Sequence, residues 1–571
     1  MVAALVRRWG VLAPLVMIMP LSACIDHEHK RNANQTPDEV PAPSGGGSGG
    51  ADTVAPRIIA TVPPRNARGA VLSGPVAVVT FSEPLAPATV NVNSFTLTGP
   101  AGRVDGDVAL QGTQALFTPR LPLIVGGDYT ASLSVAIRDP AGNPLPAAYE
   151  WQFNTGGNRL AAGARHTCLR ADSGTIKCWG DNTYGQLGVG DTQVRGDQAG
   201  ELGDNLPVVV LGRPAVEVVA GDYHSCARLD DGSVKCWGLN RVGELGIGND
   251  ETQGDAPGEM QNLPAVNLGT GRRAAQVVAG SGHTCARLDN GVVKCWGNNA
   301  YGQLGLGDTA HRGRLTTDLG DRLPAVNLGT GRLAVELVAG GFRTCARLDN
   351  GALKCWGQND AGQLGLGDTL NHGDQTNEMG DRLAAVNLGT GRLAVQLAAG
   401  RDHTCARLDD NQLKCWGLNS SAQLGVGATF NQGDENGEMG DVLPAVNLGS
   451  NRHAISVAAG LQHSCAILDD GTLKCWGANG AGELGAGDNI GRGSIGFEMG
   501  DALPAVDLGA GRSARDLVTG WNFSCAYLDN GTVKCWGRNE LGQLGLGDTA
   551  NRGDGPGELG DALGAVDLGA M

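Results

Sequence analysis

The 571-residue chain has few aromatic residues (4%) and, beyond residue 24, no stretch with helical periodicity. Its formal net charge is −16, and no cluster of Lys and Arg follows Arg8. The missing helical pattern argues against a helix bundle, and the missing basic surface excludes nucleic acid as a partner, because phosphate binding needs positive charge. Glycine is abundant instead (92 residues), and short β-branched segments alternate with Gly, Asn and Asp turns. This composition predicts an all-β protein.

One phrase returns seven times at intervals of 58 to 60 residues: a Cys, eight residues that contain an Asp-Asn-Gly-type turn, and then Lys-Cys-Trp-Gly. A fixed period of this size marks a repeat architecture. The phrase accounts for 14 of the 15 cysteines. The pairs are Cys168 with Cys178, Cys226 with Cys236, Cys285 with Cys295, Cys345 with Cys355, Cys405 with Cys415, Cys465 with Cys475, and Cys525 with Cys535.

Each pair has the spacing of a disulfide across a β-hairpin. If Asp349-Asn350-Gly351 forms a three-residue loop with Gly351 in the left-handed region, counting outward places Cys345 opposite Cys355. Such a non-hydrogen-bonded pair has its Cα atoms about 4.5 Å apart, within reach of a disulfide. Zinc ribbons and redox motifs need two intervening residues, not nine. We therefore predict seven local disulfides, each contributing roughly 2.7 kcal/mol in the chain-entropy model.

Residues 158–571 resemble the regulator of chromosome condensation repeat family. The matching phrases are Ala-Gly-x-x-His-Thr/Ser-Cys, Lys-Cys-Trp-Gly-x-Asn and Gly-Gln-Leu-Gly-x-Gly-Asp. The resemblance implies a seven-bladed β-propeller with four-stranded blades, in a secreted branch that carries disulfides. The recurring Trp of Cys-Trp-Gly is interpreted as packing between blades. Leu160–Gly163 and Ala565–Leu568 are expected to complete one shared blade and so close the ring.

Residues 53–157 are predicted to form a separate β-sandwich without cysteines. The phrases Thr80-Phe81-Ser82-Glu83-Pro84-Leu85 and Asp139-Pro140-Ala141-Gly142-Asn143 resemble a bacterial Ig-like family found in surface proteins, whose members act as spacers or adhesive modules. Asp139 and Asn143 could suggest a cation site, but we interpret them as turn residues that bond their own backbone. The expected strands are Arg57–Val62, Val76–Phe81, Ser94–Thr98, Ala115–Thr118, Tyr129–Ile137 and Tyr149–Asn154.

Residues 1–24 have the pattern of a signal peptide. The apolar run Val11–Leu21 is too short to span a bilayer, and Leu21-Ser22-Ala23-Cys24 resembles the lipobox of bacterial lipoproteins, which implies lipid attachment at Cys24. Residues 25–52 are a polar, Pro- and Gly/Ser-rich segment typical of a flexible linker. We expect a lipid-anchored monomer of the bacterial cell envelope, with the outer membrane favoured and the lipid as the sole membrane contact.

No catalytic set emerges from the repeats. The carboxylates recur in almost every repeat, which is typical of structural positions, and the recurring His becomes Arg343 and Phe523 in two repeats. Polar loops that end near Glu-Met-Gly-Asp could form an acidic binding face, or serve only as solvated loops. Calcium binding is a weaker alternative, since oxygen ligands are present without EF-hand spacing. The candidate residues are Asp374, Glu378, Asp381, Asp554, Glu558 and Asp561.

The sequence thus predicts a non-catalytic platform that binds a protein or a glycan, without a cofactor. A secreted inhibitor-like propeller is an alternative, although aromatic-poor loops count against it because binding hot spots favour Trp, Tyr and Arg. An envelope carbohydrate-active enzyme is a weaker alternative still.

Overall fold

A computed structural model describes residues 52–63, 65, 67–70, 77–99, 102–120, 123, 128–155 and 159–570. The predicted signal peptide (1–24), Cys24 and the linker up to residue 51 lie outside the described residues. Within the described part, no helix has the length and apolar character needed to cross a membrane. The described helices are α1 (Glu259–Asn262), η1 (Pro87–Thr89), η2 (Gly203–Asn205), η3 (Thr316–Asp318), η4 (Gly320–Arg322), η5 (Gly380–Arg382), η6 (Gly440–Val442), η7 (Gly496–Glu498), η8 (Gly500–Ala502) and η9 (Gly560–Ala562).

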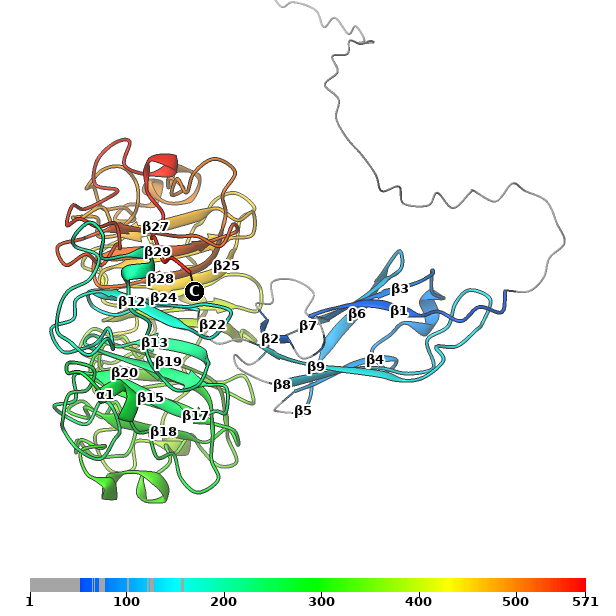
Figure 1. Ribbon diagram of the computed structural model, residues 1–571, viewed down its shortest axis with the longest axis horizontal. Coiled ribbons are helices and arrows are strands. Elements are labelled where there is room, and N and C mark those ends of the chain that lie inside the picture. Colours follow the sequence, from blue (N-terminus) through cyan, green and yellow to red (C-terminus); the bar gives the residue numbers. More distant parts are fainter. Residues whose placement is uncertain are drawn as a thin grey trace, which may run out of the picture. The chain divides into compact units, whose positions relative to one another are not determined.

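The N-terminal domain contains two β-sheets, with strand orders β1-β3-β7-β6 and β2-β9-β8-β4-β5 (Figure 1). All six expected strands are present, and β2, β5 and β6 were not anticipated. The strand predicted to reach Ile137 ends at Leu133, because a turn begins at Ser134, whose carbonyl accepts the Ile137 N–H. The strands are β1 (Ile58–Val62), β2 (Ala67–Ala70), β3 (Ala77–Phe81), β4 (Phe95–Gly99), β5 (Gly102–Arg103), β6 (Gly106–Gln111), β7 (Gln114–Pro119), β8 (Asp128–Leu133) and β9 (Tyr149–Thr155).

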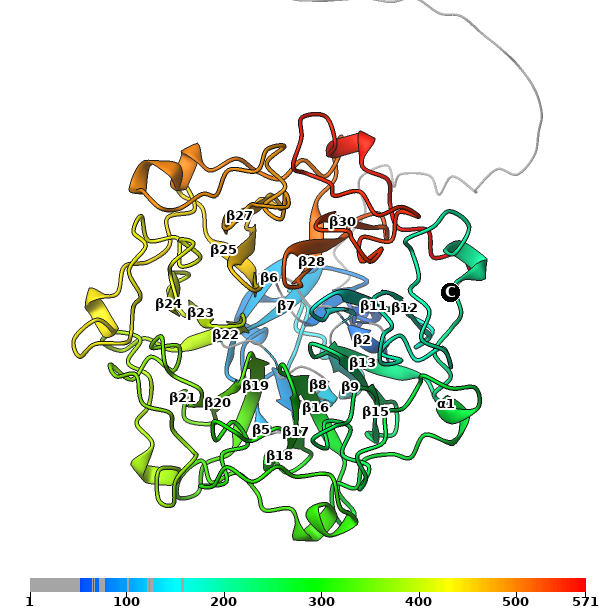
Figure 2. The same cartoon turned by 90° about the vertical axis from the view of Figure 1, so that its left-hand side faces the viewer.

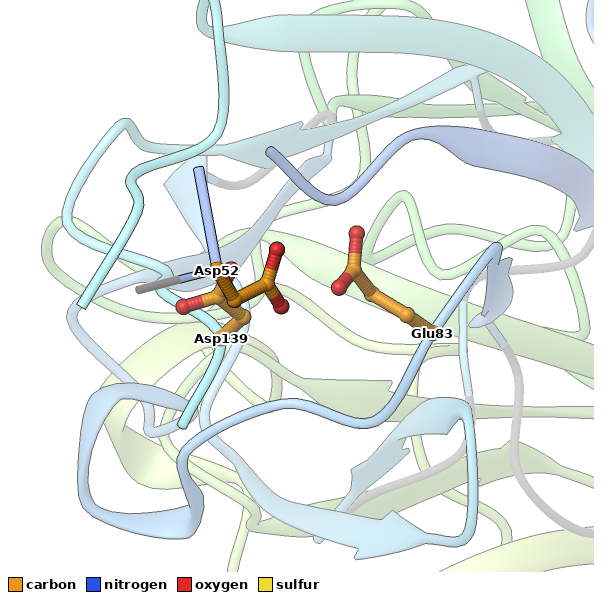
Figure 3. A group of neighbouring side chains, drawn as sticks. All are labelled: Asp52, Glu83 and Asp139. Atoms are coloured by element: carbon orange, nitrogen blue, oxygen red, sulfur yellow. The ribbon is translucent and has the colours of Figure 1, made fainter. Parts of the chain in front are cut away.

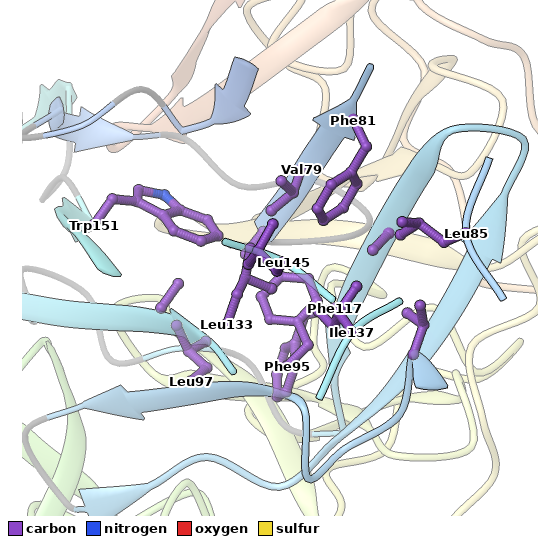
Figure 4. Close-up of a cluster of buried hydrophobic side chains, with 14 of the residues drawn as sticks. Val79, Phe81, Leu85, Phe95, Leu97, Phe117, Leu133, Ile137, Leu145 and Trp151 are labelled. Carbon is purple, nitrogen blue, oxygen red and sulfur yellow. The ribbon is translucent and has the colours of Figure 1, made fainter. Parts of the chain in front are cut away.

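The inward residues of the two sheets form one apolar core (Figure 4). Alternation along β3 places Ala77, Val79 and Phe81 inside, and the same period places Phe95 and Leu97 inside on β4. This period-two pattern is what a half-buried strand requires. The domain is therefore the β-sandwich that its sequence predicts.

The repeats form seven sheets arranged in a ring around a common axis (Figure 2). Each blade has three consecutive antiparallel strands, with the first nearest the axis. The strands are β10 (Leu160–Ala162), β11 (His166–Arg170), β12 (Ile176–Gly180); β13 (Ala215–Ala220), β14 (His224–Leu229), β15 (Val234–Gly238); β16 (Ala274–Ala279), β17 (His283–Leu288), β18 (Val293–Gly297); β19 (Ala334–Gly340), β20 (Arg343–Leu348), β21 (Leu353–Gly357); β22 (Ala394–Ala399), β23 (His403–Leu408), β24 (Leu413–Gly417); β25 (Ala454–Ala459), β26 (His463–Leu468), β27 (Leu473–Gly477); β28 (Ala514–Thr519), β29 (Phe523–Leu528) and β30 (Val533–Gly537).

The expected fourth strand of each blade is not part of the sheet. In the third blade, Val326 donates one hydrogen bond to Val293 O (2.9 Å), but the Leu328 carbonyl accepts from Lys354 Nζ of the next blade (3.1 Å). The segment divides its hydrogen bonds between two blades, so no continuous ladder forms. Its apolar side chains instead fill the space between blades, as Leu328 does at 4% exposure.

Seven hydrophobic clusters lie between neighbouring blades, one at each junction of the ring. The cluster that joins the last blade to the first contains Trp179, Phe523 and Val566. An open row of seven blades would have only six junctions, so the ring is closed. Each Cys-Trp-Gly tryptophan is buried in such a cluster, which agrees with its interpretation as packing between blades.

The ring does not close through a shared blade, and that expectation was wrong. Strands β10, β11 and β12 all come from the first repeat, and β28, β29 and β30 all come from the last. The C-terminal segment wedges between these blades: Val566 donates to Val533 O (2.9 Å), while Leu568 O accepts from Lys177 Nζ (2.7 Å). Lys354 Nζ donates in the same way to Leu328 O of the preceding repeat. The junction between the last and first blades is therefore built like the other junctions.

All seven predicted cysteine pairs are disulfide-bonded in the structure, and the paired Cα atoms are 4.0–4.1 Å apart. In each hairpin the two cysteines are direct cross-strand partners, as the turn at Gly351 requires for Cys345 and Cys355. Their exposure is 0–2%, so each bridge is shielded from solvent inside a junction. The other six bridges join Cys168 to Cys178, Cys226 to Cys236, Cys285 to Cys295, Cys405 to Cys415, Cys465 to Cys475, and Cys525 to Cys535.

We expect removal of one bridge to lower stability without changing the fold. The double variant Cys345→Ser and Cys355→Ser should lose roughly 2–3 kcal/mol of unfolding free energy, because the open hairpin regains chain entropy in the unfolded state. Thermal unfolding followed by near-UV circular dichroism checks this result. Retention of the wild-type midpoint under oxidising conditions would contradict it.

Candidate functional site

The recurring polar residues form a buried network that joins each blade to the next. The carbonyl of Gln186 in the first blade accepts hydrogen bonds from Ser225 Oγ (3.0 Å) and Trp237 Nε1 (2.9 Å) of the second. His166 Nε2 lies 2.9 Å from the same Ser225 Oγ. The corresponding His, Ser or Thr, and Trp occur at most other junctions. The recurring histidines are therefore structural.

Burial lowers the pKa of these histidines. It is about 4 for His166 and His463, and about 3 for His224, His283 and His403, with loss of solvation as the largest cause in each case. The neutral ring is thus the folded form at neutral pH. A proton-transfer role near neutral pH is not available to these groups.

The two departures from histidine preserve the junction by other means. Arg343 is 1% exposed, and its Nε donates to Thr404 Oγ1 (3.0 Å) while Nη1 donates to Arg401 O (2.6 Å). Phe523 fills the equivalent slot in the last blade without exposure to solvent. Neither residue belongs to a catalytic set.

The candidate acidic face consists mainly of structural carboxylates. Glu378 Oε2 accepts the backbone N–H groups of Gly373 (2.9 Å) and Gln375 (3.0 Å), so it holds its own loop together. Glu558 does the same for its loop, with two bonds of 2.9 Å. Burial and the neighbouring Glu378 raise the pKa of Asp374.

The aspartates at the end of these loops connect blades. Asp381 accepts the backbone N–H of Thr330 (3.0 Å) and its hydroxyl (2.5 Å), and Asp561 accepts the N–H of Ala510 (3.2 Å). Among the described residues, these loops bring no three carboxylates close enough to share a metal ion. Four of the six candidate carboxylates thus accept backbone N–H groups, which explains why the acidic pattern recurs. Asp554 occupies the position in its loop that Asp374 has in the other.

Three carboxylates do converge in the Ig-like domain: Asp52, Glu83 and Asp139 each place an oxygen within 4.8 Å of the others (Figure 3). The Asn143 backbone N–H and side-chain amide donate to the two oxygens of Asp139, at 2.9 and 2.8 Å. Asp139 and Asn143 therefore form the turn that the sequence predicts. Lost solvation, and then the charges of Asp52 and Asp139, raise the pKa of Glu83.

The loops at one end of the propeller differ between repeats. Because His224 pairs with Gly238 in the sheet, the loop before β14 and the loop after β15 leave the blade at the same edge. We call the surface formed by these two loops of every blade the axial face. Between the invariant Gly and the next strand, the seven first loops read Ala164-Arg165, Asp222-Tyr223, Ser281-Gly282, Gly341-Phe342, Arg401-Asp402, Leu461-Gln462 and Trp521-Asn522.

Backbone hydrogen bonds tie the first loops to one another. Leu461 donates to Trp521 O (3.3 Å), Trp521 donates to Ala164 O (3.3 Å), and Ala164 donates to Asp222 O (3.3 Å). Arg401 likewise donates to a carbonyl of the following blade. The side chains that differ between repeats are thus carried by loops whose backbones are hydrogen-bonded to one another.

Aromatic and arginine side chains gather on the axial face. Tyr223 makes edge contacts with Tyr184 (centroids 5.5 Å apart) and with Trp521 (6.3 Å). The guanidinium groups of Arg165 and Arg401 lie 5.8 and 5.2 Å from the Trp521 ring. The aromatic–arginine cluster comprises Arg165, Tyr184, Tyr223, Arg241, Arg401 and Trp521.

A carboxylate fixes the central ring of this cluster. Trp521 Nε1 donates to Asp222 Oδ1 (3.2 Å). Burial raises the pKa of Asp222 to about 6, although hydrogen bonds from Ser281 and Trp521 and the charge of Arg401 oppose the shift. The orientation of Trp521 is therefore set before any partner binds.

Sequence reasoning missed this cluster. Aromatics are scarce overall, but three of the six tyrosines, Tyr184, Tyr223 and Tyr301, lie on the axial face together with Phe342 and Trp521. The available signal was the set of positions at which the repeats disagree. Composition alone could not show that residues about 300 positions apart meet around one axis.

Comparisons with known families agree with the two domains. A model described as a bacterial Ig-like domain matches residues 52–155. A model of the regulator of chromosome condensation (RCC1) repeat matches residues 159–186, 215–244, 274–303, 334–363, 394–423, 454–483 and 514–543, and a second model of this repeat matches 173–228 and 231–287.

Several known proteins are similar to this chain. The ultraviolet-B receptor UVR8 of Arabidopsis thaliana is 30% identical over 58% of this chain and 68% of its own length. The probable E3 ubiquitin-protein ligase HERC6 of Homo sapiens is 32% identical over 48% of this chain, but over only 24% of its own length. Yeast RCC1 (Prp20), solved bound to Kap60, has a TM-score of 0.50 at 21% identity, over 71% of this chain and 85% of its own, which shows a shared fold.

The buried histidines predict a specific loss of stability in acid. His463 has a folded pKa of about 4, below the usual 6.5, so its contribution is complete above pH 6.5 and is lost as the pH falls towards 4. The resulting loss of unfolding free energy can reach about 3 kcal/mol, since each unit of pKa shift corresponds to about 1.36 kcal/mol. The variant His463→Gln should be destabilised at pH 7.5, and its deficit should shrink at pH 4.5.

Denaturant midpoints of both proteins at the two pH values measure this difference. Because the other histidines are common to both, their titration cancels. His453→Gln, at a half-exposed histidine, controls for the substitution itself. A deficit of constant size across this pH range would contradict the assignment.

Proposed function

We propose that this chain, which belongs to the regulator of chromosome condensation (RCC1) repeat family, uses its propeller as a non-catalytic platform that binds a protein partner through the axial face. The aromatic–arginine cluster carries the proposal. Trp, Tyr and Arg are the residue types that dominate binding hot spots. Here all three types occur side by side at positions where the repeats depart from their common pattern.

The cluster is preorganised for binding. Trp521 is held by the hydrogen bond to Asp222 and by its contacts with Arg165 and Arg401. Tyr184, Tyr223 and Trp521 are each partly exposed, so they have surface left to bury. Ordering these side chains in advance lowers the entropy cost of association. A rigid ring with varied loops is also where binding function usually lies.

The same proposal places the protein in a bacterial cell envelope, anchored by a lipid on Cys24 and favouring the outer membrane. The lipobox-like sequence before Cys24 supports the anchor. Seven buried disulfides support an oxidising compartment, because cytosolic proteins rarely keep such bonds. The linker and the Ig-like domain would act as the spacer between lipid and propeller.

An inhibitor of a secreted enzyme is a second candidate, and the same cluster favours it. The scarcity of aromatic residues in the loops counted against inhibition, but the structure concentrates those residues on one face. Under this proposal the partner is an enzyme whose activity falls on binding. An enzymatic role for this chain gains no comparable support, since its recurring His and most loop carboxylates serve structural roles.

The central test is capture of a partner from the native envelope. Full-length protein is crosslinked in envelope preparations, and captured proteins are compared with those of Trp521→Ala. The variant should lose tenfold or more of the specific partner, the scale of a hot-spot residue. Gln462→Ala, in the equivalent loop of the preceding blade, is the matched control and should retain the partner.

Equal capture by wild type and Trp521→Ala would contradict the assignment of the axial face. Activity of each captured enzyme, measured with and without the propeller, separates inhibition from simple docking. Reduced activity that returns with Trp521→Ala would favour the inhibitor role.

A further inference from the structure

A cavity of about 410 Å³ opens on the axial face between the fourth and fifth blades. Tyr301 and Phe342 form its aromatic wall, with ring centroids 5.3 Å apart and planes tilted by 39°. Both side chains are partly exposed. The volume lies within the range typical of small-molecule sites, which combine aromatic walls with a few placed polar groups.

The polar lining consists of planar side chains with fixed orientation. Asp360 accepts from Gln358 Nε2 (3.1 Å) and Gln363 Nε2 (3.4 Å), so both carboxylate oxygens are oriented by amides. Arg401 Nε lies 3.8 Å from Asp402 Oδ2, and both residues line the same cavity. Carboxylates accept two hydrogen bonds in one plane, and guanidinium groups donate two.

The lining of this cavity carries charges of both signs. A cation would meet Arg401, and an anion would meet Asp360 and Asp402. A neutral ligand with many hydroxyl groups avoids both conflicts, because each hydroxyl can donate to a carboxylate and accept from a guanidinium. The apolar face of a sugar ring also matches an aromatic wall, whose surface is apolar and flat.

A second cavity, of about 480 Å³, adjoins the first. The two share Tyr301 and Asp360, and the second extends past Leu370, whose exposure is 68%. Thr369, Asn371 and Gln375 contribute further hydroxyl and amide groups to its lining, which also includes His372, Asp374 and Glu378. Because Tyr301 and Asp360 line both cavities, we treat the two as one groove.

We propose that this groove binds a neutral oligosaccharide, with one sugar ring against Tyr301 and Phe342 and its hydroxyls on Asp360, Asp402 and Arg401. Arg401 belongs both to this groove and to the aromatic–arginine cluster, so the two proposed sites adjoin at that residue. The glycan proposal and the protein-binding proposal thus concern neighbouring sectors of the axial face.

The test applies the full-length protein to an array of neutral and anionic oligosaccharides, and titrates each bound glycan by calorimetry. Tyr301→Ala and Asp360→Asn should each weaken binding by about tenfold or more, through loss of ring contact and of paired hydrogen bonds. Tyr301→Phe should keep most of the affinity. Leu541→Ala is the matched control, because Leu541 occupies the same position in the last repeat and lies outside both the groove and the aromatic–arginine cluster.

The proposal is overturned if no neutral glycan on the array binds, if only anionic glycans bind, or if Tyr301→Ala and Asp360→Asn bind like wild type. The peptide acetyl-Arg-Gly-Arg-amide is titrated in parallel, and its binding in the groove, in place of a glycan, would show that the charge argument is wrong. Glycan binding is measured on the purified protein and partner capture in envelope preparations, so failure of the glycan site and failure of the protein contact are recorded separately.

Discussion

The junction between neighbouring blades is the constraint on which this structure depends. At its centre, a main-chain carbonyl such as that of Gln186 accepts hydrogen bonds from a hydroxyl and an indole of the next blade, here Ser225 and Trp237. The indole also fills the apolar cluster between the blades. A buried donor without a partner is costly, and six of the seven Cys-Trp-Gly indoles donate to such a carbonyl of the neighbouring blade. A single three-stranded blade has neither this carbonyl nor the facing apolar surface for its indole. The blades are therefore stable only as a ring.

This constraint explains why most conspicuous residues of the repeats are not functional. His, Trp, Lys and the loop carboxylates recur because most junctions and loops use them, and their partners are backbone groups or buried hydroxyls. Residues outside the junctions vary between repeats, and those of the axial face are among them. There the chain places Trp521 among residues of the first, second and fifth repeats, and Tyr301 beside Phe342 of the next repeat. Function is therefore proposed where the repetition fails.

Several expectations failed for a common physical reason. The segment that ends at Leu328 has the pattern of a strand, but the next blade's Lys354 takes its carbonyl, so it joins two blades instead of extending one sheet. The shared blade was wrong because Lys177 closes the ring through the same contact. Glu378 and Asp381 read as a free acidic surface, yet both accept backbone N–H groups. Lys354, Lys177 and Asp381 make these bonds to a different repeat, which a repeat read in isolation does not contain, whereas Glu378 bonds the backbone of its own loop.

The sequence by itself determined the local elements of this protein. The ten-residue separation of Cys345 and Cys355 around a Gly turn fixed both the hairpin register and the disulfide, because pairing across a short loop is set by counting residues. The seven copies of the phrase, at a period of 58 to 60 residues, likewise determined the number of blades. Only the tertiary structure decided how the ring closes and which side chains meet around its axis. Those contacts join positions hundreds of residues apart, and their geometry follows from the junctions and not from any local pattern.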